Sequence, residues 1–353
     1  MTTDARLVTV QPAEIGVRLS ESELCPDDLL GDQEAAFARD IERLQARRSE
    51  FVATACPACA AQARRLAFRK YGFEFQSCLE CATIYMSPRP SECVMADYYA
   101  ASENYAIWAS RIFPASEAAR RAKIHEPWFA RVIGYCERFG VPTGTLVEVG
   151  PGFGTFCAVA TQAGRFRQVV AVEPTPQLAA ACRARGVTVI EKRIEDAGAL
   201  LPAADVLCAF EVIEHLFDPA RFVADCARIV APGGLLLLSC PNGLGFDIAT
   251  LREEALAVDA EHVNLFNPYS LGQLVQRAGF EVLETTTPGR LDAELVRDAV
   301  LKGKFDLAAQ PLLQRVLIDE WERLGWPFQT FLAANGLSSH MWLVARRSTE
   351  GSR

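Results

Sequence analysis

The chain has 353 residues, of which 50% are hydrophobic and 23% charged, and its formal net charge is −8 at pH 7. This composition excludes a disordered or fibrous protein and suits one catalytic domain with a smaller appendage. The acidic balance disfavours nucleic acid as a partner, because sequence-independent binding of phosphates relies on surplus Lys and Arg. No run of eighteen apolar residues and no basic N-terminal segment followed by an apolar one occurs. We therefore expect neither a membrane span nor a secretory signal. The expected location is the cytoplasm.

The N-terminal part of the chain divides into three predicted segments. Residues 1–50 are expected to form an arm and a helix, because apolar residues recur at helical spacing among charges from Asp32 to Val52. Residues 51–95 contain two pairs of cysteines, and the prolines of MSPRPSE mark a boundary after them. Residues 96–140 carry aromatic and apolar residues at helical spacing, which predicts a helical cap or linker.

Residues 141–348 alternate between short apolar runs and helix-length segments. The runs TLVEV, QVVAV, VTVI, DVLCAF and LLLLS are predicted strands, and GFEVLETTT and SHMWLVARR follow them. Continuous apolar strands that alternate with helices are typical of a mostly parallel sheet covered on both faces. We therefore predict an α/β domain with a doubly wound, seven-stranded, mostly parallel sheet. Residues 291–338 are too long and too periodic for a loop, so they are predicted to be a helical insertion before the last strand.

A glycine-rich loop follows the first of these strands. In VEVGPGFG the glycines let the backbone turn tightly and approach a ligand where a side chain would collide. Glu148 precedes them, where it can face a cationic amino-acid group, and Glu173 ends the second strand, where a carboxylate can accept ribose hydroxyls. A nicotinamide-dinucleotide fingerprint would carry a further glycine where Thr155 stands.

Together with DVLCAFEVIEHLFDP and APGGLLLLSCPN, this arrangement resembles the class I methyltransferases over about Thr145 to Val344. The resemblance implies a Rossmann-like fold with S-adenosylmethionine across the strand ends. The methionine part would lie against the glycine loop, the ribose on Glu173, and the adenine near Glu195 or Asp196, which could equally be helix-start carboxylates. The residues assigned to the cofactor are Glu148, Gly150, Gly152, Gly154, Glu173, Glu195, Asp196 and Phe210.

The four cysteines of segment 51–95 stand in two CxxC pairs, CPAC and CLEC, with strand-like sequence between them. Four thiolates at this spacing match tetrahedral structural zinc with no position left for water, so we predict a zinc ribbon. A redox pair or four unligated thiols are the alternatives. Ala60 and Ala82 stand where such ribbons often have glycine. The predicted zinc ligands are Cys56, Cys59, Cys78 and Cys81.

The run of CPAC, CLEC, TIYMSPRPSE and DYYAASENYAIW is similar to a bacterial group in which a zinc ribbon precedes the methyltransferase. Members of that group methylate deoxysugars attached to nucleotide carriers. The resemblance implies methylation of an oxygen, nitrogen or activated carbon on a small molecule or glycan, such as a nucleotide-linked sugar or a secondary metabolite. Tyr98, Tyr99 and Tyr105 would then cover cofactor and substrate, unless they are core residues.

The segment EVIEH follows the fourth predicted strand, and Glu211, Glu214 and His215 would converge on one point if it coiled. It resembles the ExxEH of ubiquinone-pathway O-methyltransferases and small-RNA 2′-O-methyltransferases, in which those side chains hold magnesium. His262 stands where the RNA enzymes have a further histidine. Three assignments stay open: a magnesium site, His215 as general base beside two carboxylates that stabilise the sulfonium, or His215 as a structural residue.

Two other functions are compatible with parts of the sequence. A ribosomal-RNA methyltransferase with a zinc module is one, but the acidic charge and the lack of interleaved aromatic and basic residues count against it. A non-catalytic zinc-ribbon binding protein is the other, and the intact glycine loop and its two carboxylates count against that. The sequence favours no oligomeric state.

Overall fold

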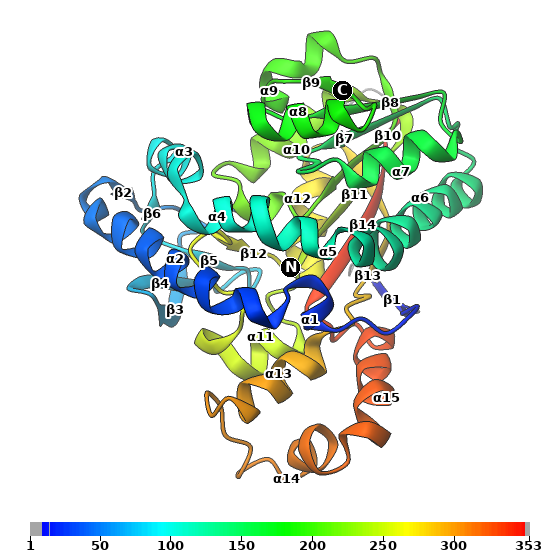
Figure 1. Ribbon diagram of the computed structural model, residues 1–353. Helices are drawn as coiled ribbons and strands as arrows, with labels where there is room; N and C mark the ends of the chain where they lie inside the picture. The colour runs from blue at the N-terminus through cyan, green and yellow to red at the C-terminus, as the bar shows by residue number, and fades with distance from the viewer. Residues whose placement is uncertain (1–8, 14, 350–353) are drawn as a thin grey trace, which may run out of the picture.

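The computed structural model describes residues 9–13 and 15–349, and an eight-stranded sheet runs through its centre (Figure 1). The strand order is β1-β13-β14-β11-β10-β7-β8-β9. β14 is antiparallel to both neighbours, and the other pairs are parallel, so the mostly parallel sheet is confirmed. The bounds are β1 (Val10–Gln11), β7 (Thr145–Val149), β8 (Gln168–Val172), β9 (Thr188–Ile190), β10 (Ala204–Phe210), β11 (Val230–Pro241), β13 (Phe280–Thr286) and β14 (His340–Arg347).

The sheet has one strand more than the seven predicted, because the N-terminal arm adds β1. Val10 and Gln11 pair in parallel with Thr285 and Thr286 at the edge of the sheet. Two residues are too few to show an alternating pattern, so no sequence signal marks this strand. The arm satisfies backbone groups that an edge strand would otherwise leave unpaired.

Side chains of each strand alternate between two hydrophobic cores, one on each face of the sheet. On β10, Val206 and Cys208 face the core shared with α6 and α7, whereas Leu207 and Ala209 face the core shared with α10 and α12. The sheet is therefore covered on both faces, as a doubly wound domain requires. The helices of this domain are α6 (Glu126–Phe139), α7 (Thr155–Ala163), α8 (Pro176–Ala184), α9 (Ile194–Ala197), α10 (Pro219–Ile229) and α12 (Pro268–Arg277).

The helix predicted from Asp32 to Val52 begins earlier and ends earlier. After α1 (Glu21–Leu24), α2 covers Asp27–Ala46. A 3₁₀ turn follows, and then β2 (Phe51–Val52) pairs with β6 (Arg89–Pro90). Phe51 belongs to this pairing and stacks on Phe73, with ring centroids 5.8 Å apart, so its apolar side chain is explained by a tertiary contact rather than by helix periodicity.

Segment 51–95 shares a sheet with the main domain instead of forming an isolated ribbon. β3 (Arg64–Lys70) and β4 (Phe73–Cys78) form a hairpin, and β5 (Ile84–Met86) pairs with β4. The fourth strand, β12 (Asn264–Leu265), comes from the main domain and pairs antiparallel with β5. The small sheet is thus fixed to the loop that precedes α12.

A helical cap runs from the small sheet across to the main domain (Figure 1). It consists of α3 (Glu92–Ala101), α4 (Glu103–Ile107) and α5 (Phe113–Arg120), with π-helical turns after α4 and α5. Phe113 of the cap stacks on Phe153 of the glycine-rich loop, with ring centroids 4.0 Å apart. The cap therefore lies against the carboxyl edge of the main sheet.

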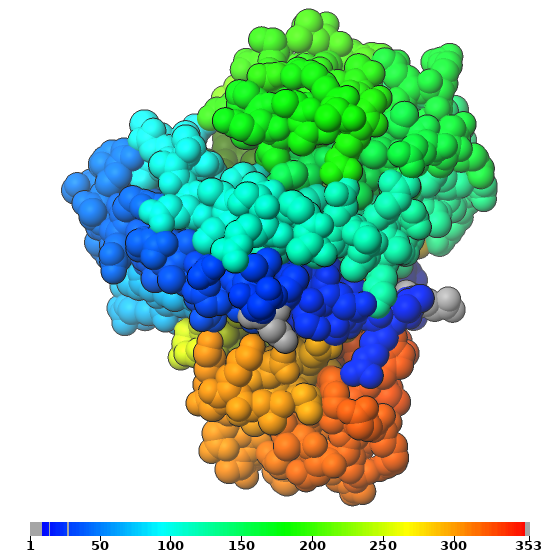
Figure 2. Space-filling model, viewed as in Figure 1, coloured from blue at the N-terminus to red at the C-terminus, as the bar shows by residue number. Residues whose placement is uncertain are grey.

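Within the predicted insertion 291–338, α13 (Asp292–Leu301), α14 (Pro311–Gln314) and α15 (Trp321–Ala334) form a lobe at the bottom of Figures 1 and 2. α13 packs beside α11 (Phe246–Leu251), which follows β11, and Phe328 of α15 contacts Phe246 of α11 with ring centroids 5.2 Å apart. Over the residues that the structure describes, no helix combines the length and apolar character needed to cross a membrane.

Candidate functional site

The glycine-rich loop joins β7 to α7, and all three of its glycines have positive φ, at 68°, 54° and 75° for Gly150, Gly152 and Gly154. A Cβ on Gly150 would stand 2.7 Å from Val212 Cγ2, and one on Gly154 would stand 2.7 Å from Cys182 Sγ. A Cβ on Gly152 would meet no atom within 4 Å. The outer glycines are therefore required by packing, while the middle one borders open space that a ligand could enter.

Glu148 lies just before this loop and is 4% exposed. It accepts a hydrogen bond from Cys157 Sγ at 2.9 Å. Burial raises the pKa of Glu148 to about 7, because a carboxylate loses its hydration inside the protein. A cationic group placed beside it would favour the ionised form.

Glu173 follows β8 and is also 4% exposed. Burial raises its pKa, and the backbone N–H groups of Thr175 and Gly152 oppose that rise. The hydrogen bond from Thr175 N to Oε1 is 2.9 Å long. The carboxylate therefore sits next to the open side of the glycine loop, at the carboxyl ends of two neighbouring strands.

The other residues assigned to the cofactor differ in their exposure and contacts. Glu195 and Asp196 are exposed in the first turn of α9, and Glu195 pairs with Arg193 at 3.2 Å. Phe210 is 7% exposed, and its ring packs at 4.8 Å from that of Trp128 in the core. The Phe210 side chain therefore belongs to the core, and the backbone after it borders the site.

The EVIEH segment does not bring its three polar side chains to one point, which corrects the expectation from the sequence. Glu211 has a left-handed backbone conformation with φ of 54°, and only Ile213–His215 coil as a 3₁₀ turn. Glu211 is therefore not in the cluster of Glu214, His215 and His262, although its charge acts on all three. Its Oε1 accepts hydrogen bonds from Ser239 Oγ at 2.6 Å and from His340 Nε2 at 2.9 Å.

Glu214, His215 and His262 do lie together, with potential ligand atoms within 4.8 Å of one another. Glu214 is fully buried without a hydrogen bond to either carboxylate oxygen, and burial raises its pKa well above the ordinary value. Burial and the neighbouring His262 lower the pKa of His215 to about 4. Burial alone would lower the pKa of His262, but Asp259 and the Ala257 carbonyl raise it. His215 is therefore a neutral imidazole at pH 7.

The three tyrosines come from the cap and contact different residues. Tyr98 donates a hydrogen bond to Glu261 at 2.6 Å, and the Tyr99 hydroxyl lies 3.4 Å from His215 Nδ1. Burial raises the pKa of Tyr105, and the nearby carboxylate of Glu173 adds to the rise. The cap thus places one tyrosine beside the histidine pair and another beside the end of β8.

The four cysteines of the small sheet meet at one point. Cys56 and Cys81 have their sulfurs 3.5 Å apart, as do Cys59 and Cys78, and all four sulfurs lie within 4.8 Å of one another. A Zn–S bond of about 2.3 Å places neighbouring sulfurs of a tetrahedron about 3.8 Å apart, so this donor set fits zinc. Ala60 and Ala82 adopt φ of 60° and 57°, the conformation for which glycine is the usual residue.

Sequence reasoning missed a buried link between β6 and the histidine pair. Arg89 Nη1 donates to Asn264 Oδ1 at 2.9 Å, and Asn264 Nδ2 donates to the Leu216 carbonyl at 2.7 Å, directly after His215. It also missed His340 and Trp128. Arg89 and Asn264 carry no local sequence signal, because their partners are 48 residues or more away along the chain.

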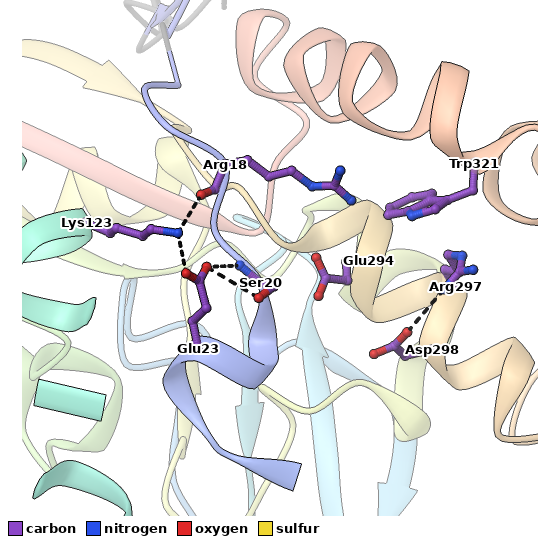
Figure 3. A pocket seen from close by; sticks show the side chains of 8 residues that line it. All are labelled: Arg18, Ser20, Glu23, Lys123, Glu294, Arg297, Asp298 and Trp321. Atoms are coloured by element: carbon purple, nitrogen blue, oxygen red, sulfur yellow. Dashed lines mark hydrogen bonds and ion pairs between the residues drawn. The ribbon is translucent and has the colours of Figure 1, made fainter. Parts of the chain in front are cut away.

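A cavity of about 360 Å³ opens elsewhere, where the N-terminal arm meets the end of the cap and the insertion (Figure 3). Trp321 lies between two guanidinium groups, with Arg18 at 5.6 Å and Arg297 at 5.1 Å from its ring centroid. Lysine and acidic side chains line the rest, and no residue assigned to the site from the sequence is among them. The lining residues are Arg18, Ser20, Glu23, Lys123, Glu294, Arg297, Asp298 and Trp321.

Comparison with known proteins bears on the main domain. Residues 117–285 match the sequence model of a family described as a methyltransferase domain. A Mycolicibacterium smegmatis protein named "Probable S-adenosylmethionine-dependent methyltransferase" is 41% identical over 83 residues, which cover 24% of this chain and 31% of that protein. A "Ubiquinone biosynthesis O-methyltransferase" of Rhodopseudomonas palustris is 32% identical over 102 residues, which cover 28% of this chain and 39% of that protein.

The chain thus spans less than half the length of these two relatives. Among solved structures, an S-adenosylmethionine-dependent methyltransferase from Archaeoglobus fulgidus aligns with a TM-score of 0.41 and 16% identity, over 65% of this chain and 96% of that one. The sequence matches agree with the glycine loop and its two carboxylates. Residues 117–285 are thus similar to S-adenosylmethionine-dependent methyltransferases.

Proposed function

We propose that the whole protein transfers a methyl group from S-adenosylmethionine to an oxygen, nitrogen or activated carbon of a small molecule. The observation that carries this proposal is the juxtaposition of Glu148, Gly152 and Glu173 at the carboxyl ends of β7 and β8. Ligands of doubly wound folds bind at this edge of the sheet. Glu173 would accept the ribose hydroxyls, and Glu148 and the glycines would hold the methionine part.

The chemistry asks for in-line positioning and for a proton acceptor, because the sulfonium is already activated. Glu211 follows β10 next to the cofactor edge and would stabilise the sulfonium charge. His215 is neutral at pH 7 and would accept the proton of an oxygen or nitrogen nucleophile. Tyr99 would help to orient it, since its hydroxyl lies 3.4 Å from Nδ1.

A metal ion is the second assignment for the same place. Glu214, His215 and His262 offer one carboxylate and two imidazoles, and the unpaired buried oxygens of Glu214 favour a cationic partner. This donor set suits Mn²⁺, Fe²⁺ or Zn²⁺ better than Mg²⁺, which prefers oxygen ligands and bound water. Glu211 would not take part, because it is paired with Ser239 and His340.

We further propose that Cys56, Cys59, Cys78 and Cys81 hold a structural zinc ion. Their geometry supports it, and so do hydrogen bonds from the main domain to the two CxxC turns: Asn267 Nδ2 to the Cys81 carbonyl at 2.8 Å and Arg277 Nη1 to the Ala58 carbonyl at 2.6 Å. A four-thiolate site has no open position, so this zinc would act on folding and not on the reaction.

A nucleotide-linked sugar or a secondary metabolite is the proposed acceptor. Tyr98, Tyr99, Tyr105 and Glu261 supply hydroxyl and carboxylate groups suited to a polyhydroxylated molecule. A phenol is a second candidate, since a relative is named as a ubiquinone-biosynthesis enzyme. Ribosomal RNA fits the net charge of −8 poorly. A non-catalytic zinc-ribbon protein would be expected to have lost the glycine loop.

Calorimetry with S-adenosylmethionine alone tests the proposal without knowledge of the acceptor. Glu173→Ala should weaken binding by about 1–3 kcal/mol, the usual cost of leaving buried polar partners unmatched. Glu281→Ala, an exposed glutamate on β13, serves as the matched control and should bind like the original protein. Equal affinity in the Glu173 and Glu281 variants would place the ribose elsewhere. A screen of methyl transfer across nucleotide sugars and small phenols then identifies the acceptor.

A further inference from the structure

Glu211 has a strained backbone conformation that its local sequence does not explain. Its φ of 54° lies in the left-handed region that residues with a Cβ avoid. The residue still donates its N–H to the Ser239 carbonyl at 3.0 Å, so the pairing of β10 with β11 continues to this point. Strain of this kind persists only where the surroundings hold it, and it clusters at functional sites.

Three neighbouring strands meet at this carboxylate. β10 ends just before Glu211, β11 supplies Ser239, and β14 begins with His340 opposite Pro241 of β11. Because β14 is antiparallel, its first residue lies at the edge of the sheet where the parallel strands end. Ser239 Oγ donates to Glu211 Oε1 at 2.6 Å and His340 Nε2 donates to the same oxygen at 2.9 Å.

His340 is itself held in place on two sides. Its ring stacks on Trp128 of α6, with centroids 6.0 Å apart and an angle of 7° between the ring planes. The two residues before it are fixed by the buried Asp292 of α13, which accepts hydrogen bonds from Ser338 Oγ and from the Ser339 N–H. The imidazole thus approaches Glu211 from a fixed direction.

The second oxygen of Glu211, Oε2, takes no part in these contacts. Both hydrogen bonds end on Oε1, and among the described residues Oε2 accepts none. The Glu211 side chain keeps 39% of its surface accessible and His340 keeps 27%. Burial alone would raise the pKa of Glu211, but His340, Ser239 and the nearby His262 lower it below its ordinary value, so the group is ionised at pH 7.

We propose that His340 is a positioning residue of the cofactor site, which together with Ser239 fixes the Glu211 carboxylate so that Oε2 faces the sulfonium of S-adenosylmethionine. The inference rests on the proposed function and goes beyond it, because it assigns a role to a residue that follows the insertion and lies outside the matched domain. The charge of the carboxylate then favours the cationic cofactor over its neutral product, S-adenosylhomocysteine. That preference helps to exchange product for a new cofactor molecule.

The test measures the dissociation constants of S-adenosylmethionine and S-adenosylhomocysteine by calorimetry on the full chain and compares their ratio. Glu211→Gln should weaken the binding of S-adenosylmethionine by about tenfold or more, as expected for loss of one nearby charge. The affinity for S-adenosylhomocysteine, which carries no sulfonium charge, should change by less than about twofold. His340→Leu should shift the ratio in the same direction. His340→Gln should restore it, because a glutamine amide can donate to Oε1 in place of Nε2.

His125→Leu is the matched control, since His125 also packs on Trp128, with ring centroids 5.7 Å apart, but makes no hydrogen bond to Glu211. It should leave the ratio unchanged. An unchanged ratio of dissociation constants in His340→Leu would overturn the inference. An equal loss of affinity for both ligands would also overturn it, because it would show that His340 acts only on the fold. Absence of binding of either ligand to the original protein would instead refute the proposed function, so the two failures are distinguishable.

Discussion

Glu148→Gln should make the ligand-free protein more stable and at the same time poorer at binding S-adenosylmethionine. Burial raises the pKa of Glu148 from 4.5 to about 7, and such a rise corresponds to about 3 kcal/mol of free energy. The unfolded chain releases this proton at lower pH than the folded protein does. The contribution of Glu148 to stability is therefore complete below about pH 4.5 and lost progressively as the pH rises through about 7.

Glutamine keeps the shape of the side chain and can still accept the hydrogen bond from Cys157 Sγ, but it does not titrate. In urea denaturation, the free energy of unfolding of the variant should exceed that of the original protein by up to about 3 kcal/mol at pH 8.5 and by little at pH 5. Glu281→Gln, on the exposed side of β13, controls for surface effects. Cofactor binding should be weaker in Glu148→Gln, because the amide cannot neutralise the ammonium group.

Binding to the original protein near pH 7 should also release protons, since the ammonium group favours the ionised carboxylate. Calorimetry in buffers of different ionisation enthalpy counts these protons, and the count should fall in Glu148→Gln. Parallel stability curves for the original protein and the variant between pH 5 and pH 8.5 would refute the reasoning, because they would show that Glu148 has an ordinary pKa.

Three further outcomes follow from the geometry. Metal analysis of purified protein should find about one zinc ion per chain, and Cys78→Ser should lose the metal and unfold at lower urea concentration, because metal bonds supply folding energy. Gly154→Ala should lower the free energy of unfolding by about 2–4 kcal/mol in the same denaturation assay, because of its positive φ and overpacking against Cys182. Gly164→Ala is the control: its φ is 61°, but no atom lies within 4 Å of the added Cβ, so the loss should be about 1 kcal/mol. The chelator used on His215 must be too weak to remove an ion from four thiolates. If His215 acts without a metal, turnover should continue in this chelator, and His215→Ala should lower the rate by about 10²–10⁴. If it binds a metal, the chelator should abolish activity and added Mn²⁺ should restore it.

The parts of the fold that the sequence predicted are those with a strong local pattern. All seven predicted strands of the main sheet are present, because each is an apolar run that both cores bury. The cysteine cluster follows from spacing alone, since two CxxC turns on a hairpin bring four sulfurs together. β1 and β12 have two residues each and escaped detection, because their pairing is set by the strands beside them.

The sequence predicts those residues of the candidate site whose positions are set by the ends of strands. It does not predict the residues whose positions are set by tertiary contacts. Glu148 lies near the end of β7 and Glu173 follows β8 directly, so their positions are set by the parallel sheet. Glu211 was expected to coil toward His215, but it takes a left-handed conformation that only its contacts with β11 and β14 explain. His340 could have been suspected, because the first residue of an antiparallel strand lies at the carboxyl edge of the parallel ones.

Three segments outside the matched domain reach the loop that follows β10. Arg89 of β6 is joined to it through Asn264, Tyr99 of the cap lies beside His215, and His340 after the insertion binds Glu211. The family match covers residues 117–285, which contain the glycine loop, Glu148 and Glu173 but none of these three contacting residues. The similarity of residues 117–285 to other methyltransferases therefore bears on which cofactor the chain would bind. The acceptor, in contrast, would meet surfaces built by the small sheet, the cap and the insertion, so we expect its identity to follow these segments and not the domain that carries them.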